Sequence, residues 1–336
     1  MTNEENFRDK SGREFKFTSQ DFQRVRKLIY DYAGISLSDS KQELVYSRLS
    51  RRLRATGIGS FEEYLGLLER NDEAEWQAFT NSLTTNLTSF FREPHHFPIL
   101  AEHMTRHKHR EHFSIWCSAS STGEEPYSIA MTAVDAFGSY TPPVSIIATD
   151  LDTNVLATAE AGVYPEERVA KLEPDLVKRF FLRGTGKQAG YVKVRQELRD
   201  MITFRKLNLL DNSWPIRSPL DAIFCRNVMI YFDKATQLAI LKKFVPLLRA
   251  DGLLFAGHSE SFYHAEEYFR LRGKTVYELA TKPRDPIRAA ARGESSVAKA
   301  HDSLRAGTSV ESPAAKSSEP SQAHGSLLPR GRLGKL

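Results

Sequence analysis

Residues 113–152 read FSIWCSASSTGEEPYSIAMTAVDAFGSYTPPVSIIATDLD, and this stretch decides the fold. A short apolar run, Phe113–Cys117, leads into a loop of small polar residues, a helical stretch and a second apolar run that ends in Asp150. This order predicts a βαβ unit with an acidic residue at the end of its second strand. In nucleotide-binding α/β folds an acid at that place takes the ribose hydroxyls of the ligand. We therefore expect an adenosine-type ligand at this edge of the sheet.

The loop of this unit indicates which adenosine ligand is bound. It lacks the G-x-G-x-x-G pattern of dinucleotide sites, and it contains Glu124 and Glu125. Two carboxylates would repel a diphosphate but would tolerate a neutral or cationic ligand. The loop therefore favours S-adenosylmethionine, whose sulfonium is positive, over NAD.

Composition limits the class of protein. The chain has 336 residues, enough for one large or two modest domains. Its two cysteines, Cys117 and Cys225, lie in apolar runs and are expected to be buried free thiols in a reducing compartment. We find no signal peptide and no apolar run near the roughly 20 residues of a membrane helix. A cytoplasmic protein without direct membrane insertion is expected.

The net charge of +5 is concentrated in the carboxyl-terminal tail. From residue 281 onward the chain has ten basic and five acidic residues, so the preceding part is neutral. A neutral body argues against a nucleic-acid partner. Residues 282–336 contain no aromatic residue and are expected to be disordered, either as an unselected extension or as a tether or basic arm.

The rest of the chain divides into two predicted domains. After a flexible segment at 1–14, residues 15–90 carry apolar residues at helical spacing and predict an N-terminal helical domain. Residues 91–281 alternate strands with helices, which predicts an α/β, Rossmann-like domain with a mainly parallel sheet. With the S-adenosylmethionine site expected above, this would be the methyltransferase domain. Within it, the β-prone runs Arg179–Leu182 and Tyr191–Val194 predict a small inserted antiparallel β-subdomain at about 179–200.

Polar side chains follow two further strands of this domain. Asn208 comes directly after one predicted strand, and Asn227 comes after the strand that ends at Cys225. The carboxyl ends of parallel strands form the ligand crevice of an open α/β sheet, so both amides are expected on its rim. Asn86 and Thr88 precede the domain and could serve there, or could cap a helix start.

Five segments together resemble the CheR-type chemotaxis receptor methyltransferases, across about residues 20–280: TTNLTSFFRE, STGEEPYSIA, ATDLD, CRNVMIYFDK and LLFAGHSESF. The resemblance implies a protein-glutamate O-methyltransferase that uses S-adenosylmethionine and forms γ-glutamyl methyl esters and S-adenosylhomocysteine for chemotactic adaptation. It implies no metal, a monomer, and recruitment to receptor clusters. Carried over by motif, it implies a cofactor site formed by Asn86, Thr88, Arg92, Glu125, Asp150, Asn208, Leu209, Asn227 and Val228.

The chemistry fits this resemblance. A glutamate with a pKa of about 4.3 is already anionic at neutral pH, so its methylation needs no general base. Alignment of the reacting groups and exclusion of water can contribute about 7–11 kcal/mol. We expect Arg92 to be catalytic, since a guanidinium can orient a carboxylate by two hydrogen bonds. Alternatively, Arg92 holds the carboxylate of the cofactor.

Two surfaces could contact the cytoplasmic helical region of a chemoreceptor. Arg48, Arg51 and Arg52 share a helical face that either steers glutamate-bearing helices or is simply solvated. The β-subdomain resembles the family's docking site for a receptor's carboxyl-terminal peptide, which binds as an added strand. Arg183 and Gly190 fit that site, whereas Lys193 stands where arginine is expected and lacks the planar fork.

A cluster of histidines is expected to be solvated rather than to bind zinc, because no nearby cysteine or H-E-x-x-H motif completes a site. Its members are His95, His96, His103, His107, His109 and His112.

Two other functions are weighed against receptor methylation. A base-amine methyltransferase of nucleic acids would carry Asn/Asp-Pro-Pro-aromatic where this chain has Asn227-Val-Met-Ile, without prolines. A scaffold that binds the cofactor without turnover would keep the same cofactor residues, and only methyl incorporation separates it from an enzyme.

Overall fold

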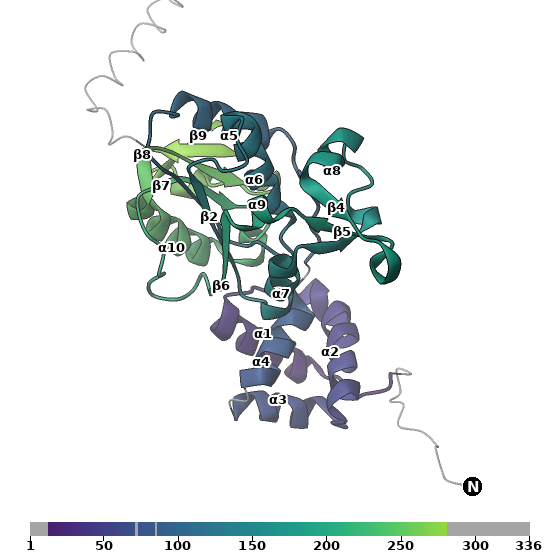
Figure 1. The fold of residues 1–336 in the computed structure, drawn as a ribbon. Helices are drawn as coiled ribbons and strands as arrows, with labels where there is room; N and C mark the ends of the chain where they lie inside the picture. Colours follow the sequence, from purple (N-terminus) through teal and green to yellow (C-terminus); the bar gives the residue numbers. More distant parts are fainter. Residues whose placement is uncertain (1–12, 71–72, 85, 281–336) are drawn as a thin grey trace, which may run out of the picture. The chain divides into compact units, whose positions relative to one another are not determined.

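The computed structural model describes residues 13–70, 73–84 and 86–280 (Figure 1). The chain divides into two units, Met1–Thr281 and Lys282–Leu336. The second unit, and with it the predicted disordered tail, lies outside the described residues. So does most of the predicted flexible segment at 1–14.

The amino-terminal part is helical, as predicted. Its α-helices are α1 Ser19–Ala33, α2 Gln42–Thr56, α3 Phe61–Glu69 and α4 Glu73–Leu83. Helix α1 begins at a capping box formed by Thr18 and Asp21, and it ends at Gly34, which adopts φ +68°. Apolar residues at helical spacing pack into one core, which includes Phe22, Val25, Ile29, Val45, Leu49, Phe61, Tyr64 and Phe79.

The α/β part is built on a seven-stranded sheet in the order β6-β2-β1-β7-β8-β10-β9. Its strands are β1 Phe113–Cys117, β2 Val144–Asp150, β6 Ile202–Lys206, β7 Leu220–Cys225, β8 Leu248–Ala256, β9 Phe269–Gly273 and β10 Val276–Leu279. The first five are mutually parallel, and β10 pairs antiparallel with β8 and β9. Strand order reverses between β1 and β7, and such a reversal opens a crevice at the carboxyl ends of the strands.

Helices cover both faces of this sheet (Figure 1). They are α5 His96–Arg106, α6 Glu124–Phe137, α7 Thr153–Ala161, α9 Gln196–Arg199 and α10 Lys234–Phe244, whereas α8 Pro174–Phe180 leads directly into the separate strand β4 Phe181–Arg183. Side chains alternate along each strand, so Ile115 packs with α5 and α6 whereas Trp116 packs with α10. Two apolar layers therefore hold the sheet, and the predicted α/β class with a mainly parallel sheet is confirmed.

The predicted antiparallel insertion is present as a three-stranded sheet, here called the β-subdomain. It consists of β3 Val163–Pro165, β5 Tyr191–Val194 and β4 Phe181–Arg183, in that spatial order. The first strand was not predicted from the sequence, and it begins at residue 163, before the predicted bounds of about 179–200. Arg179 belongs to α8 rather than to a strand, since that helix continues to Phe180.

Both cysteines are buried and free, as predicted. Burial raises the pKa of each thiol, so Cys117 and Cys225 are unreactive core residues. Among the helices that the structure describes, none has the length and apolar character to cross a bilayer.

Candidate functional site

One pocket lies at the carboxyl ends of β1, β2, β6 and β7, on the crevice that the strand order creates. It brings together all nine residues predicted for the cofactor site, which come from segments spread over more than a hundred residues of sequence. These are Asn86, Thr88, Arg92, Glu125, Asp150, Asn208, Leu209, Asn227 and Val228.

The carboxylate at the end of β2 is held in a fixed orientation. Asp150 accepts the backbone N–H of Ser121 on Oδ2 at 2.8 Å and that of Asp152 on Oδ1 at 3.0 Å. Burial raises the pKa of Asp150, and these hydrogen bonds oppose the shift. Each oxygen keeps further acceptor capacity, so the carboxylate is suited to bind a pair of hydroxyl groups.

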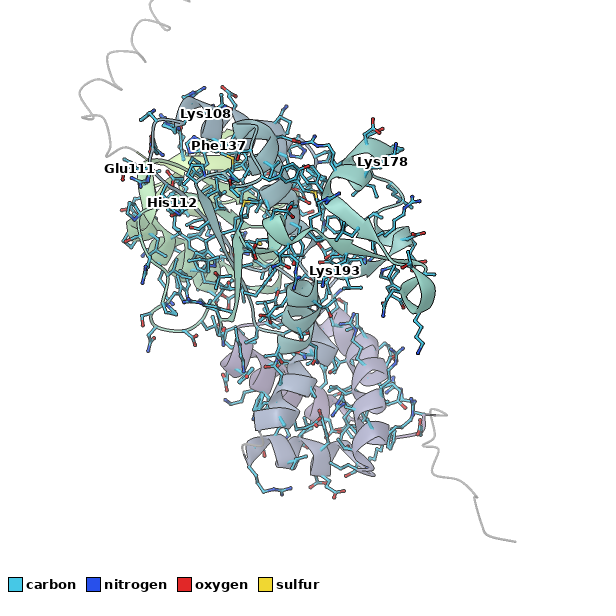
Figure 2. All side chains as sticks on the ribbon, in the orientation of Figure 1. Lys108, Glu111, His112, Phe137, Lys178 and Lys193 are labelled. Atoms are coloured by element: carbon cyan, nitrogen blue, oxygen red, sulfur yellow. The ribbon has the colours of Figure 1, made fainter. Side chains whose placement is uncertain are left out.

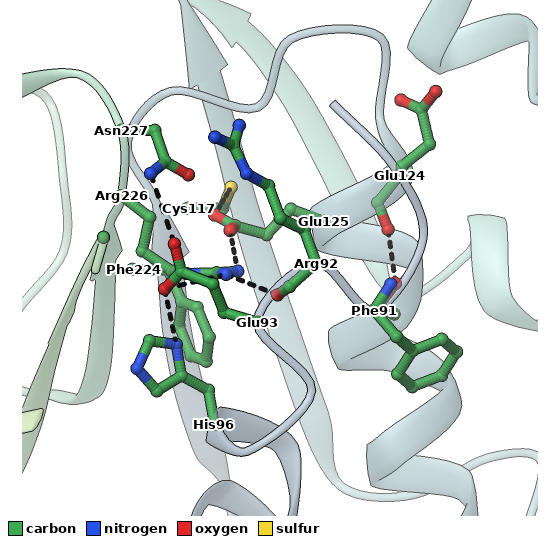
Figure 3. Close-up of polar contacts among 12 residues, drawn as sticks. Phe91, Arg92, Glu93, His96, Cys117, Glu124, Glu125, Phe224, Arg226 and Asn227 are labelled. Carbon is green, nitrogen blue, oxygen red and sulfur yellow. Dashed lines mark hydrogen bonds and ion pairs between the residues drawn. The ribbon is translucent and has the colours of Figure 1, made fainter. Parts of the chain in front are cut away.

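The two glutamates that the sequence placed in the loop lie in the first turn of α6, and both are compensated by arginine. Glu125 accepts from the Arg226 guanidinium on Oε2 and from the Cys117 thiol on Oε1 at 3.1 Å (Figure 3). Glu124 is fully buried and forms an ion pair with Arg168 at 3.2 Å. Pairing with arginine therefore reduces the repulsion of a diphosphate that the sequence predicted for these two carboxylates.

Arg226 is the central residue of this network, and the sequence analysis did not select it. Its side chain is 1% exposed, and besides Glu125 it donates to the backbone carbonyl of Arg92 and lies 3.4 Å from Glu93 Oε2. The available signal was an arginine directly after the buried strand β7, beside Asn227. Its partner Glu125 is 101 residues away, so the pairing follows only from the fold.

Glu93 is ionised within this network. Burial acts to raise its pKa, but the backbone hydrogen bond from His258, the charge of Arg226 and the Asn227 amide outweigh burial and lower it to about 2. The residue adopts φ +56°, a left-handed conformation that is uncommon for glutamate. The chain between α4 and α5 therefore turns sharply as it enters the pocket.

The helical domain closes one side of the pocket. Ala33, the last residue of α1, and Ile35 line it together with Thr84. The Asn208 amide donates to the Tyr32 carbonyl at 2.8 Å, and Asn86 donates to the Asp152 carboxylate at 3.0 Å. Two of the predicted cofactor residues therefore also join the two domains.

Arg92 lies at the pocket with its side chain partly exposed. Within the described residues its guanidinium donates one hydrogen bond, to the Leu87 carbonyl at 2.9 Å. A guanidinium has five N–H groups, so several are left to meet an anion.

The predicted receptor-binding arginines of α2 do not form one solvated face. The Arg48 guanidinium donates to the carbonyls of Ser82, Leu83 and Thr84, which lie at the carboxyl end of α4. Arg52 makes a two-pronged ion pair with the buried Glu75. Of the three, Arg51 is the exposed one. The solvated-face expectation is therefore wrong for Arg48 and Arg52, because both hold α2 against α4.

The three predicted residues of the β-subdomain are exposed. Arg183 lies on β4, Lys193 on β5 (Figure 2), and Gly190 precedes β5 with φ +86°. Because β5 is the central strand, β4 and β3 are the edges of this small sheet.

The histidine cluster is not uniformly solvated, which corrects the expectation from sequence. His96 is fully buried and His103 is 3% exposed. His96 Nε2 lies 2.9 Å from the Lys274 carbonyl, and its ring packs on Phe255.

One group of side chains near this histidine has the spacing of a metal site. Glu93, His95 and His96 offer three ligand atoms within 4.8 Å. Because Arg226, Asn227 and His258 already contact the Glu93 carboxylate, we assign this group to the hydrogen-bonded network.

These buried rings predict an acid sensitivity. Burial lowers the pKa of both His96 and His103 to about 4. Since the unfolded pKa is near 6.5, the unfolded chain takes up protons first, and stability is lost as the pH falls from about 6.5 towards 4. For each of these two histidines, lowering the pH from 7 to 5 should reduce the free energy of unfolding by about 2 kcal/mol.

Urea unfolding at the two pH values measures this loss. His103→Gln should reduce the pH-dependent loss by about 2 kcal/mol, whereas His112→Gln, at an exposed ring, should not. Equal losses in the wild type and His103→Gln would show that folding does not lower the pKa of His103.

The fold and the site together define the class of protein. A doubly wound sheet carries, at its switch point, a pocket with an acid suited to ribose hydroxyls, as in α/β enzymes that bind an adenosine cofactor. Residues 86–278 match the family described as "CheR methyltransferase, SAM binding domain", and residues 20–84 match "CheR methyltransferase, all-alpha domain". The chain belongs to the CheR methyltransferase family, and its larger domain is an S-adenosylmethionine-binding methyltransferase domain.

Several curated relatives are similar over most of their length. Chemotaxis protein methyltransferase 2 of Pseudomonas aeruginosa is 57% identical over 268 residues, which is 80% of this chain and 95% of the relative. Chemotaxis protein methyltransferase of Escherichia coli is 55% identical over 260 residues, covering 77% and 90%. A probable chemotaxis protein methyltransferase of Rhizobium etli is 39% identical over 263 residues, covering 76% and 98%.

Proposed function

We propose that this protein transfers the methyl group of S-adenosylmethionine to glutamate side chains of chemotaxis receptors, forming γ-glutamyl methyl esters. The relatives named above as chemotaxis protein methyltransferases support the receptor as substrate. The pocket supports the type of acceptor. Its two carboxylates, Glu125 and Asp150, both accept hydrogen bonds within the site, so neither is poised to remove a proton.

A carboxylate acceptor suits such a pocket. An amine or alcohol must lose a proton during methylation, whereas a glutamate reaches the site already ionised at neutral pH. The chain's own residues then have to bind the cofactor and the glutamate, orient them towards each other and exclude water. The observation that carries the proposal is that Glu125 and Asp150 already accept hydrogen bonds within the site. A glutamate acceptor needs no general base there.

The residues present fit the cofactor. Asp150 offers two fixed carboxylate oxygens to the ribose hydroxyls, while the Glu125 charge is balanced by Arg226. Asn86, Asn208 and Asn227 add amide groups around the same space. Bound there, S-adenosylmethionine supplies the methyl group and the positive sulfonium from which it leaves.

In this proposal Arg92 is the residue that orients the incoming glutamate carboxylate. Arg92→Ala should lower kcat/KM for receptor about a hundredfold, the effect of about 3 kcal/mol from a charge-assisted, two-pronged contact. Arg92→Lys should be intermediate, because lysine keeps the charge and lacks the planar fork.

Initial rates with varied receptor and varied cofactor measure this effect. A rise confined to the KM for S-adenosylmethionine would place Arg92 on the carboxylate of the cofactor instead. Near-normal turnover of Arg92→Ala at saturating cofactor would remove it from either role.

Peptide mapping by mass spectrometry tests the proposed acceptor. A chemoreceptor cytoplasmic fragment incubated with enzyme and cofactor should gain the mass of one CH₂ group at each methylated glutamate. Replacing those glutamates by glutamine should abolish the gain. Methylation of lysine, arginine or hydroxyl side chains would contradict the proposal.

Comparing receptor fragments with and without their carboxyl-terminal residues tests the second proposed contact. It shows whether the exposed edge strand β4 binds such a peptide by strand addition.

The proposal includes the setting of the reaction. A monomeric cytoplasmic enzyme would be recruited to receptor clusters through these contacts, and Arg51, an exposed arginine of α2, would be available for steering. Nucleic acid has no part in it.

A further inference from the structure

The turn after β8 holds a buried glutamate against the pocket residue Asn227. Glu260 is 5% exposed, and its Oε2 accepts the backbone N–H of Asn227 at 2.9 Å and that of Gly257 at 2.5 Å. Asn227 adopts φ +58°, in the left-handed region that asparagine tolerates better than most residues. The Glu260 carboxylate thus holds the backbone of Asn227 in this uncommon conformation.

Gly257 permits this contact because it has no side chain. A Cβ at this position would lie 2.3 Å from Asn227 Nδ2 and 2.9 Å from both Asn227 N and Glu260 Oε2. The Asn227 amide therefore packs directly on the backbone at the end of β8, where even a methyl group would displace it.

Glu93 determines which way the Asn227 amide faces. Glu93 Oε1 lies 3.3 Å from Asn227 Nδ2, and it also accepts the backbone N–H of His258 at 3.0 Å. An ionised carboxylate can only accept hydrogen bonds, so the group that faces it must be the amide NH₂. Figure 3 shows this nitrogen on the line towards Glu93 and the amide oxygen turned away from that line.

We propose that Glu260 and Glu93 are positioning residues that fix the Asn227 amide so that its oxygen accepts a hydrogen bond from the bound cofactor. Neither acid has to touch the cofactor for this. Glu260 sets the backbone and Glu93 sets the amide orientation, so Asn227 meets the ligand without losing further rotational freedom. The inference rests on the proposed function in taking S-adenosylmethionine as the ligand.

Calorimetric titration of S-adenosylmethionine and S-adenosylhomocysteine into the full chain tests this role. Glu260→Ala should weaken both affinities about tenfold to a hundredfold, the effect of losing one well-placed hydrogen bond. Glu260→Gln should weaken binding less than Glu260→Ala, because its amide oxygen can still accept the backbone N–H groups of Asn227 and Gly257. Glu102→Ala, at an exposed glutamate of α5, is the matched control.

A double-mutant cycle separates positioning from a general loss of structure. Asn227→Gly removes the amide while tolerating φ +58°, and adding Glu260→Ala to it should weaken binding no further. Additive losses, or a Glu260→Gln variant as weak as Glu260→Ala, would overturn the proposal. So would wild-type affinity in Glu260→Ala.

Thermal unfolding of each variant shows that the fold is intact. If Glu260→Ala does not fold, Gly257→Ala takes its place, because its new methyl group must displace the amide. A wild type that does not bind S-adenosylmethionine would overturn the proposed function together with this inference. A wild type that binds it, with variants that bind equally well, would overturn the positioning role alone.

Discussion

Replacing Arg226 with methionine is expected to lower the unfolding free energy by about 3–5 kcal/mol, because it leaves buried carboxylates without their counter-charge. The Arg226 side chain is 1% exposed, while those of Glu93 and Glu125 are 9% and 12% exposed. The two acids come from different segments, so the guanidinium also ties the chain before α5 to the start of α6. Urea unfolding at neutral pH measures the loss.

A charge-neutral background is the control for this prediction. Glu93→Gln and Glu125→Gln combined with Arg226→Met should recover much of the stability, because no unpaired buried charge remains. A loss below about 1 kcal/mol for Arg226→Met alone would mean that water enters the site and solvates the acids.

Asp150→Ala is expected to weaken the binding of S-adenosylmethionine at least a hundredfold. Two hydrogen bonds from ribose hydroxyls to a carboxylate contribute about 1.5–3 kcal/mol each, and 1.4 kcal/mol is a factor of ten. Asp150→Asn should also bind poorly. Its NH₂ would face the backbone N–H of Ser121 or of Asp152, both of which need an acceptor.

Calorimetric titration gives these affinities, with thermal unfolding to confirm that each variant folds. Asp135→Ala is the matched control, because Asp135 is an exposed acid of α6 that pairs with Arg179. An Asp150→Ala affinity within threefold of the wild type would remove Asp150 from the ribose site.

That these residues would share one pocket could be predicted from sequence, because several of them stand at strand ends. Asp150 and Asn227 each come at or just after the end of a recognisable apolar run, and parallel strands bring their carboxyl ends to one edge. The same reasoning placed Asn208. The pocket at that edge contains all three.

The residues that hold these groups could not be predicted in the same way. Arg226 and Glu260 lie inside segments that were recognised, but their partners depend on which loops meet in space. Glu93 contacts Asn227 across 134 residues of sequence. A buried ion pair leaves no periodic pattern, so only the fold reveals it.

Charged and aromatic side chains were misjudged for a related reason. Arg48 and Arg52 have the spacing of an exposed helical face, yet the carboxyl end of α4 and Glu75 cover it. His96 and His103 look like surface residues of a polar helix, but α5 packs them against the sheet. Helical spacing predicts which residues share a face, and the neighbouring element decides whether that face is buried.

The most direct test of the central claim is the transfer of radiolabelled methyl from S-adenosylmethionine to a chemoreceptor cytoplasmic fragment, followed by mild alkaline treatment. A carboxylate methyltransferase should give label that base releases as methanol, and Asp150→Ala should abolish it while Asp135→Ala does not. Label that survives base would contradict carboxylate methylation. Cofactor binding without labelling of any of several receptors would mean that the protein is a cofactor-binding scaffold or acts on a different substrate.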